Sequence, residues 1–283
     1  MEQDAARTRD QRMDMVLESV LGALVTVGTG LLAGTLMLRP ESLVASLVPA
    51  CALLLGCMVG VMLRRRSGAG NWRTLGLIAG SGVLAGVGAM ASGPILYSLL
   101  SILSLIGSVG VLLLLISSRL GGMNRRAVAE VLSLPILGAL QMAFCGGWLL
   151  SRGSLGREIV PQDQSLLSLA ILAIVVEVLV FRRWKDAITR ENGVLQLPAS
   201  LSRWGYVGLS NLKAWGVSLG VSGLLLMTIT QEGAVFGWLA AAAMVVGQVM
   251  GWVLVLAAER GTDALRGGRD VSRTQGLQEQ AGG

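Results

Sequence analysis

The chain has 283 residues, of which 53% are hydrophobic and 14% are charged, and its mean hydropathy is +0.68. One soluble core cannot bury that much apolar surface, so the composition excludes an ordinary soluble domain and indicates an integral membrane protein. The formal net charge of +6 does not indicate nucleic-acid binding, because the basic residues lie between apolar runs and are not gathered with aromatic residues. The chain has no histidine, and its three cysteines form no CxxC pair, which excludes histidine-ligated haem, a histidine metal site and a Ser-His-Asp triad.

The first 14 residues are polar and of mixed charge, without an apolar core followed by a cleavage site, so we interpret them as a cytoplasmic tail. A helix needs about 20 mainly apolar residues to cross a bilayer. Eight segments meet or approach that length, at residues 16–38, 43–63, 74–93, 95–117, 128–150, 165–182, 212–230 and 234–257. Gly93 and Pro94 join the third and fourth segments with almost no loop, which predicts an antiparallel hairpin. The fold class predicted is an all-α integral membrane protein, with a bundle of eight transmembrane helices over residues 15–259.

The basic residues are distributed unequally between the two sides of the predicted bundle. All but three of the 23 Lys and Arg residues lie in the two tails or in the connections after the second, fourth and sixth segments. The exceptions are Arg39, Arg152 and Arg157. This positive-inside bias predicts that both termini are cytoplasmic. The C-terminal tail, residues 260–283, is polar and glycine-rich, and we expect it to be disordered.

Many of the 39 glycines lie four residues apart inside the predicted spans. Small residues one helical turn apart allow two helices to approach closely, so we interpret these glycines as packing positions within the bundle. The pairs are Gly30 with Gly34, Gly56 with Gly60, Gly76 with Gly80, Gly216 with Gly220, and Gly247 with Gly251.

Polar side chains inside spans are the candidates for function, because an ionisable group in hydrocarbon costs about 2.5–3.5 kcal/mol. Glu177 is the clearest case. Two interpretations stay open: its carboxylate pairs with Arg182 or Arg183 near the interface, or it handles protons beside a quinone or a substrate path. Gln141 and Gln248 lie deep in the fifth and eighth spans, where we expect each amide to bond a neighbouring helix.

Five tryptophans lie near predicted span ends, where an interfacial belt explains them: Trp72, Trp148, Trp184, Trp204 and Trp238. The basic connection after the sixth span could lie on the membrane or dock a soluble partner. The sequence contains no phosphate-binding loop, metal-ligand cluster or paired carboxylates, so we predict no catalytic residue and no metal ligand within this chain.

Three short passages carry a family resemblance. The first runs from Met62-Leu63 through a glycine-containing turn to Trp72, Thr74-Leu75 and Ser81. The second contains Pro135, Gln141 and Phe144-Cys145-Gly146-Gly147, and the third is Gly247-Gln248-Val249-Met250-Gly251. With the eight spans and the chain length, they resemble the membrane anchor subunit of dimethyl sulfoxide reductases. The chain departs from that family at Arg64, where the family has a histidine, at Gly86, where it has an acidic residue, and at Gln248, where it has a glutamate.

The resemblance implies a non-catalytic subunit of an oxidoreductase complex in anaerobic electron transport, multi-pass in the bacterial inner membrane. Such a subunit binds menaquinol and passes its electrons to an iron-sulfur subunit and then to a molybdopterin catalytic subunit. It implies a quinol site in which Arg64 and Trp72 lie beside the quinone head, and Glu177 or Gln141 accepts or relays protons.

Two other classes of function remain open. A small multi-span transporter or permease would use Glu177 as its coupling group, with a path between glycine-faced helices. A membrane scaffold would bind no ligand.

Overall fold

A computed structural model describes residues 2–40, 42–68, 71–91, 93–117, 125–152, 161–192, 212–213, 216, 219–226 and 235–256. All regular structure in these ranges is helical. The helices are α1 (Glu2–Leu38), α2 (Leu43–Ser67), α3 (Trp72–Met90), α4 (Pro94–Ser117), α5 (Arg125–Gln141), the π-helical turn η2 (Met142–Gly146), α6 (Gly147–Arg152) and α7 (Pro161–Asn192). The last described helix is Val235–Leu256, here termed the closing span.

Seven of the described helices are long and apolar enough to cross a membrane. They are Met13–Leu38, Leu43–Ser67, Trp72–Met90, Pro94–Ser117, Ser133–Leu150, Gln164–Arg183 and Val235–Leu256. The described part of the chain is therefore all-helical, and its seven long apolar helices indicate a multi-pass membrane protein, as predicted. The predicted segment 212–230 is described only in part, with helical residues at 212–213, 216 and 219–226, so the count of eight and the side of the termini stay predictions.

The structure describes one of the two predicted tails and not the other. The first, residues 1–14, forms the first turns of α1, which is helical from Glu2 onward. The second, residues 260–283, lies outside the described residues, so its predicted disorder is untested.

The helices α2, α3 and α4 follow one another through short connections, and each packs on the next. The turn after α2 uses Gly68 in the left-handed conformation, with φ 67°, and Asn71 then accepts a hydrogen bond from the backbone N–H of Arg73 at the start of α3. The predicted hairpin at Gly93-Pro94 is confirmed, since α3 ends at Met90 and Pro94 is the first residue of α4.

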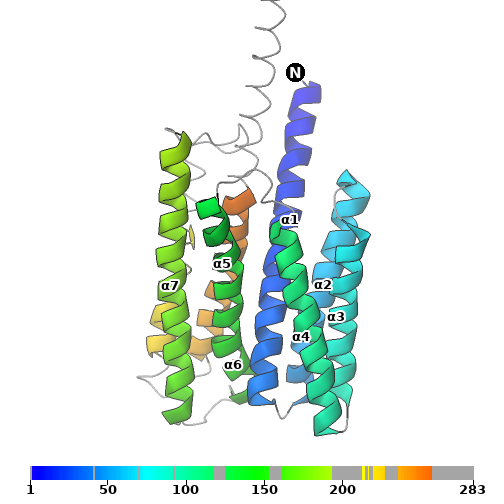
Figure 1. Ribbon diagram of the computed structural model, residues 1–283, viewed down its shortest axis with the longest axis vertical. Coiled ribbons are helices and arrows are strands. Elements are labelled where there is room, and N and C mark those ends of the chain that lie inside the picture. Colours follow the sequence, from blue (N-terminus) through cyan, green and yellow to red (C-terminus); the bar gives the residue numbers. More distant parts are fainter. Residues whose placement is uncertain are drawn as a thin grey trace, which may run out of the picture.

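Helix α1 is the centre of the described bundle. In Figure 1 it stands between α2, α3 and α4 on one side and α5 and α7 on the other, and it packs on α2, α4, α5, η2 and α6. Its spanning window is 72% buried, against 28% for α2 and α7. The hydroxyls of Ser19, Thr26 and Thr29 each donate to the carbonyl four residues earlier, so its buried polar side chains are satisfied within the helix.

Small residues allow α1 to meet η2 closely. A Cβ atom on Gly34 would lie 2.6 Å from the Cα of Gly147, and one on Gly30 would lie 2.7 Å from the Cβ of Met142. Close packing is thus confirmed for this glycine pair. A Cβ on Gly76 or Gly80 would meet no described atom within 4 Å, so that pair has no such role inside the described bundle.

The tryptophans do not all form a belt. Trp72 and Trp238 are exposed, as a belt requires, whereas Trp148 is 4% exposed and packs among Leu31, Leu149 and other core residues. The prediction was wrong for Trp148 because α6 packs on α1. The side chains of Trp184 and Trp204 lie outside the described part of the chain.

Candidate functional site

Glu177 belongs to the buried face of α7. Leu167, Ala170, Ile174 and Glu177 follow one another at intervals of three and four residues, and all are buried. This spacing places them on one stripe of a helix. The packing of α7 on α5 and η2 therefore turns the carboxylate of Glu177 into the bundle, where it is 2% exposed.

The counter-charge of Glu177 is Lys213. The Nζ atom of Lys213 lies 2.8 Å from Oε1 of Glu177, and the two side chains are 5% and 2% exposed. The same Nζ lies 4.5 Å from the ring centre of Phe181, one turn further along α7. Two charges removed from water in this way require each other, because either one alone would be uncompensated.

The pairing of Glu177 with Lys213 differs from the interpretation that its carboxylate pairs with Arg182 or Arg183. The side chains of Arg182 and Arg183 are exposed, and neither contributes a described contact to Glu177. Lys213 was missed because it was counted with the basic residues of the cytoplasmic connection, although it is the second residue of the predicted segment 212–230. The sequence did hold a signal for this pair. Lys213 lies at the start of the seventh apolar segment, and Glu177 lies six residues before Arg183, near the end of the sixth. Both positions are therefore near the same predicted side of the membrane.

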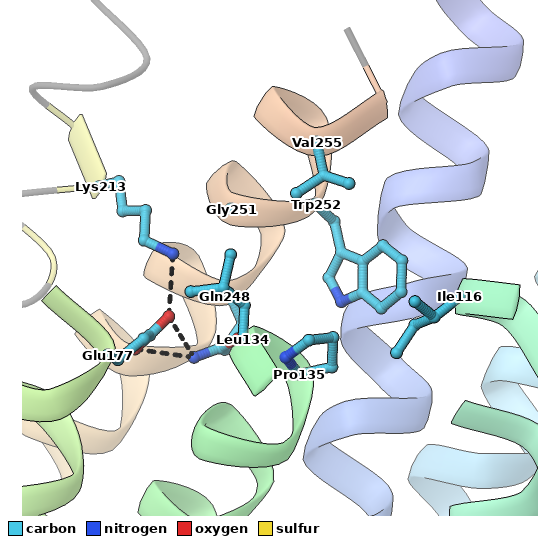
Figure 2. A pocket seen from close by; sticks show the side chains of 9 residues that line it. All are labelled: Ile116, Leu134, Pro135, Glu177, Lys213, Gln248, Gly251, Trp252 and Val255. Atoms are coloured by element: carbon cyan, nitrogen blue, oxygen red, sulfur yellow. Dashed lines mark hydrogen bonds and ion pairs between the residues drawn. The ribbon is translucent and has the colours of Figure 1, made fainter. Parts of the chain in front are cut away.

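Two amides also contact the carboxylate. The Nε2 atom of Gln141, at the end of α5, donates to Oε2 of Glu177, and Nε2 of Gln248, in the closing span, lies 3.4 Å from both carboxylate oxygens. The expectation that these amides bond neighbouring helices is confirmed. Figure 2 shows the ammonium of Lys213 and the amide of Gln248 pointing at Glu177 from different segments.

Two glycines make room for these polar side chains. A Cβ on Gly138 of α5 would lie 2.6 Å from Nε2 of Gln248, and a Cβ on Gly251 would lie 2.8 Å from Nζ of Lys213. At either distance, a methyl group would force the polar end of the side chain to shift away from Glu177. Gly138 and Gly251 therefore allow the amide and the ammonium to reach the carboxylate.

A cavity of about 20 Å³ adjoins the ion pair. Its remaining walls are mainly apolar: Ile116, Leu134, Pro135, Trp252 and Val255 (Figure 2). The indole N–H of Trp252 donates to the hydroxyl of Thr26 on α1, at 3.2 Å, which fixes that wall. About 10–15 Å³ holds one water molecule, so the cavity has room for a water beside the charges but not for a quinone ring.

Arg64 and Trp72 form a second pair, away from Glu177. The guanidinium of Arg64 lies 4.5 Å from the ring centre of Trp72, at the turn between α2 and α3. This turn lies on the side of α1 opposite α7 (Figure 1). The structure thus brings Gln141 to Glu177 and Arg64 to Trp72, but it does not gather the four predicted quinol-site residues in one place.

Substitution of Gly251 by alanine should lower the free energy of unfolding by about 1–3 kcal/mol, because the new methyl group must displace the paired ammonium of Lys213. Gly110→Ala is the matched control, since a Cβ there meets no described atom within 4 Å and alanine is the better helix former, so it should not lower stability. Unfolding of both variants in mixed micelles, followed by circular dichroism, measures the difference. Equal stability of the two would show that Gly251 has no role in seating Lys213.

Among the described residues, no three His, Cys, Asp or Glu side chains are grouped so that they could hold a metal ion. The chemistry that the site offers is proton exchange: a carboxylate, an ammonium that compensates it, two amides that orient it and space for one water. Comparisons with family models, with curated proteins and with solved structures find no match to this chain.

Proposed function

We propose that this chain is the membrane anchor subunit of a molybdenum oxidoreductase of the dimethyl sulfoxide reductase type. It would hold an iron-sulfur subunit and a molybdopterin catalytic subunit at the bacterial inner membrane and pass them electrons from menaquinol. The observation that supports this proposal is that residues from two of the passages that carry the resemblance lie close together in the structure. Pro135 and Gln141 come from one passage, Gln248 and Gly251 from the other, and all four lie around Glu177 or its cavity.

In this proposal Glu177 is a proton acceptor. Oxidation of menaquinol to menaquinone releases electrons to the iron-sulfur subunit and protons to the protein. The Glu177 carboxylate takes one of these protons from the water that the adjoining cavity can hold, because that cavity has no room for the quinol itself. Lys213 compensates the carboxylate before proton uptake, and the amides of Gln141 and Gln248 hold it in position.

Recognition of the quinol head is assigned to Arg64 and Trp72. Trp72 is 61% exposed and its ring is already held beside the guanidinium of Arg64, so an aromatic face and a cation are both accessible at the edge of the bundle. Ring recognition and proton uptake are thus assigned to places on opposite sides of α1, and the experiment that follows tests proton uptake at Glu177.

The double variant Glu177→Gln/Lys213→Met removes both charges and should keep the fold, because the amide introduced at position 177 can still accept from the neighbouring amides. Its quinol-dependent reduction should fall by about 100-fold, the scale of a lost proton-transfer group. Turnover with a reduced menaquinol analogue in proteoliposomes measures this, and iron and molybdenum content reports assembly. Glu18→Gln, which changes another carboxyl inside a predicted span, is the control and should retain turnover. Full turnover of the assembled double variant would exclude Glu177 as the acceptor.

A proton-coupled transporter is the second candidate. The specific observation in its favour is that the buried charges and amides come from four separate segments, which is how ion and proton paths are built in membrane bundles. Purification in mild detergent separates the two. Co-purifying iron-sulfur and molybdenum subunits favour the anchor, whereas substrate flux into liposomes by the isolated chain favours the transporter.

A further inference from the structure

A second cavity lies at the other end of the bundle from the Arg64–Trp72 turn. It measures about 420 Å³ and lies between the α1–α2 connection and the α3–α4 connection. Its size is within the range of small-molecule sites. Arg39, Ser46 and Tyr97 are the polar residues among its described walls, which also include Leu43, Ala89 and Pro94. The proposed function uses none of these residues.

The backbone of Arg39 is in an unusual conformation. Arg39 follows the last residue of α1 with φ 41°, and its N–H donates to the carbonyl of Thr35, at 2.9 Å. Glycine is the usual residue at such a left-handed helix end, and a side chain there costs about 1–2 kcal/mol. The structure therefore keeps a long cationic side chain at this position although its backbone conformation is unfavourable.

The guanidinium of Arg39 is held along one edge only. Its Nη2 atom donates to the carbonyl of Pro94 and to the hydroxyl of Ser98, both at 3.0 Å, and its central carbon lies 5.5 Å from the ring centre of Tyr97. The hydroxyl of Tyr97 in turn donates to the carbonyl of Thr35. Arginine has five N–H donors, and those of Nε and Nη1 bond no described residue. A positioned cation thus lines the cavity with unused donors.

The surroundings indicate an anionic ligand with an apolar part. No acidic residue is among the described residues that line the cavity; Glu41, in the α1–α2 connection, lies outside the described part of the chain. Val44 and Ile95, next to the cavity at the starts of α2 and α4, are 74% and 83% exposed. Apolar side chains this exposed beside a cation match a lipid, whose acyl chains cover them while its phosphate reaches the guanidinium.

We propose that the cavity at Arg39 binds the phosphate of an anionic membrane lipid. The lipid phosphate accepts from the unused donors of Arg39, and the acyl chains follow the exposed faces of α2 and α4. A free phosphate has the same anionic chemistry but leaves the apolar faces uncovered. Competition between inorganic phosphate and the lipid therefore distinguishes these two ligands.

Native mass spectrometry of the full chain with phosphatidylglycerol, and with phosphatidylcholine of the same acyl chains, tests this proposal. Phosphatidylglycerol should bind at least about tenfold more tightly, and Arg39→Gln should remove about tenfold to a hundredfold of its affinity. Ser46→Phe, which fills the cavity and leaves Arg39 intact, should weaken binding in the same way and covers the case in which Arg39→Gln fails to fold. Arg73→Gln, an exposed arginine at the opposite end, is the matched control and should bind as the unaltered chain does.

Three outcomes would overturn the proposal. Unchanged phosphatidylglycerol affinity in Arg39→Gln or Ser46→Phe removes the site. An equal loss in Arg73→Gln shows general charge attraction rather than a site. Displacement of the lipid by inorganic phosphate in moderate excess assigns the cavity to a soluble anion.

Discussion

Replacing Lys213 by methionine should lower the free energy of unfolding by about 3–5 kcal/mol, one of the largest effects expected for a single substitution in this chain. The Nζ atom of Lys213 lies 2.8 Å from Oε1 of Glu177, and both side chains are almost fully buried. Methionine fills the volume of the lysine stem but carries no charge. Among the described residues, the amides of Gln141 and Gln248 then remain to stabilise the buried carboxylate of Glu177.

The second half of this prediction concerns the double variant Glu177→Gln/Lys213→Met, which should recover most of the loss. A neutral amide at position 177 leaves no charge uncompensated and can still accept from Gln141 and Gln248. Arg182→Met is the control, because this exposed residue on the same helix has no described contact with Glu177 and should change stability by less than about 0.5 kcal/mol.

Reversible unfolding of the four proteins in mixed micelles completes a double-mutant cycle. A coupling energy of several kcal/mol between positions 177 and 213 is the expected result. If the double variant is as unstable as Lys213→Met, the instability comes from packing around residue 213 rather than from an unpaired charge.

The spans were predictable because hydropathy and turn residues depend only on the local sequence. Hydropathy along the chain places α2 from residue 43, and α2 begins at Leu43; Gly93-Pro94 marks the hairpin, and α4 begins at Pro94. Where charged residues follow an apolar run, the predicted end is too early. Residues 64–66 continue α2 to Ser67, because a helix satisfies its own backbone and extends past the apolar core.

The site was predictable only in part, because its contacts join residues far apart in the chain. Glu177 and Gln141 were identified as polar groups inside spans, but their separation of 36 residues gives no sequence signal that they meet. Which face of a helix turns inward depends on its rotation against neighbours, and hydropathy does not report that rotation. The same limit explains Trp148, which lies near a span end in sequence yet is 4% exposed.

The π-helical turn η2 also has no clear signal in the sequence. Its closing residue Gly146 and the following Gly147 form a glycine pair, and Gly147 lies against Gly34 of α1. A π-turn inserts an extra residue into the helical repeat, so it changes which side chains face α1 and which face α7. It begins directly after Gln141, and it therefore helps to set the direction of the amide that bonds Glu177.

The second large effect is expected where α1 packs on η2 and on the flanking residues Ala139 of α5 and Gly147 of α6. The double variant Gly30→Ala/Gly34→Ala should lower the free energy of unfolding by about 2–6 kcal/mol, because each overpacked position costs about 1–3 kcal/mol. The methyl groups would meet the carbonyl oxygens of Ala139 and Ala143 and the Cα of Gly147. Backbone atoms cannot move aside as the end of a flexible side chain can, so the two helices must separate.

Gly76→Ala/Gly80→Ala is the matched control, with the same substitution at the same spacing on α3. A Cβ at either position meets no described atom within 4 Å, and alanine is the better helix former, so this variant should lose no stability. If both double variants lose stability equally, the loss reflects glycine replacement in general and not the contact with η2.

Cys145 lies inside η2, and its reactivity gives a second measurement of the packing of this turn. This cysteine is completely buried inside the turn, whereas Cys51 is exposed and Cys57 is half-buried. With Cys51 and Cys57 replaced by serine, Cys145 should react slowly with N-ethylmaleimide in the unaltered background and in Gly76→Ala/Gly80→Ala. Separation of η2 from α1 exposes the thiol, so Gly30→Ala/Gly34→Ala should raise its rate of modification. A large stability loss without faster modification would place the damage elsewhere in α1, because the contact between Gly34 and Gly147 would then have survived the substitution.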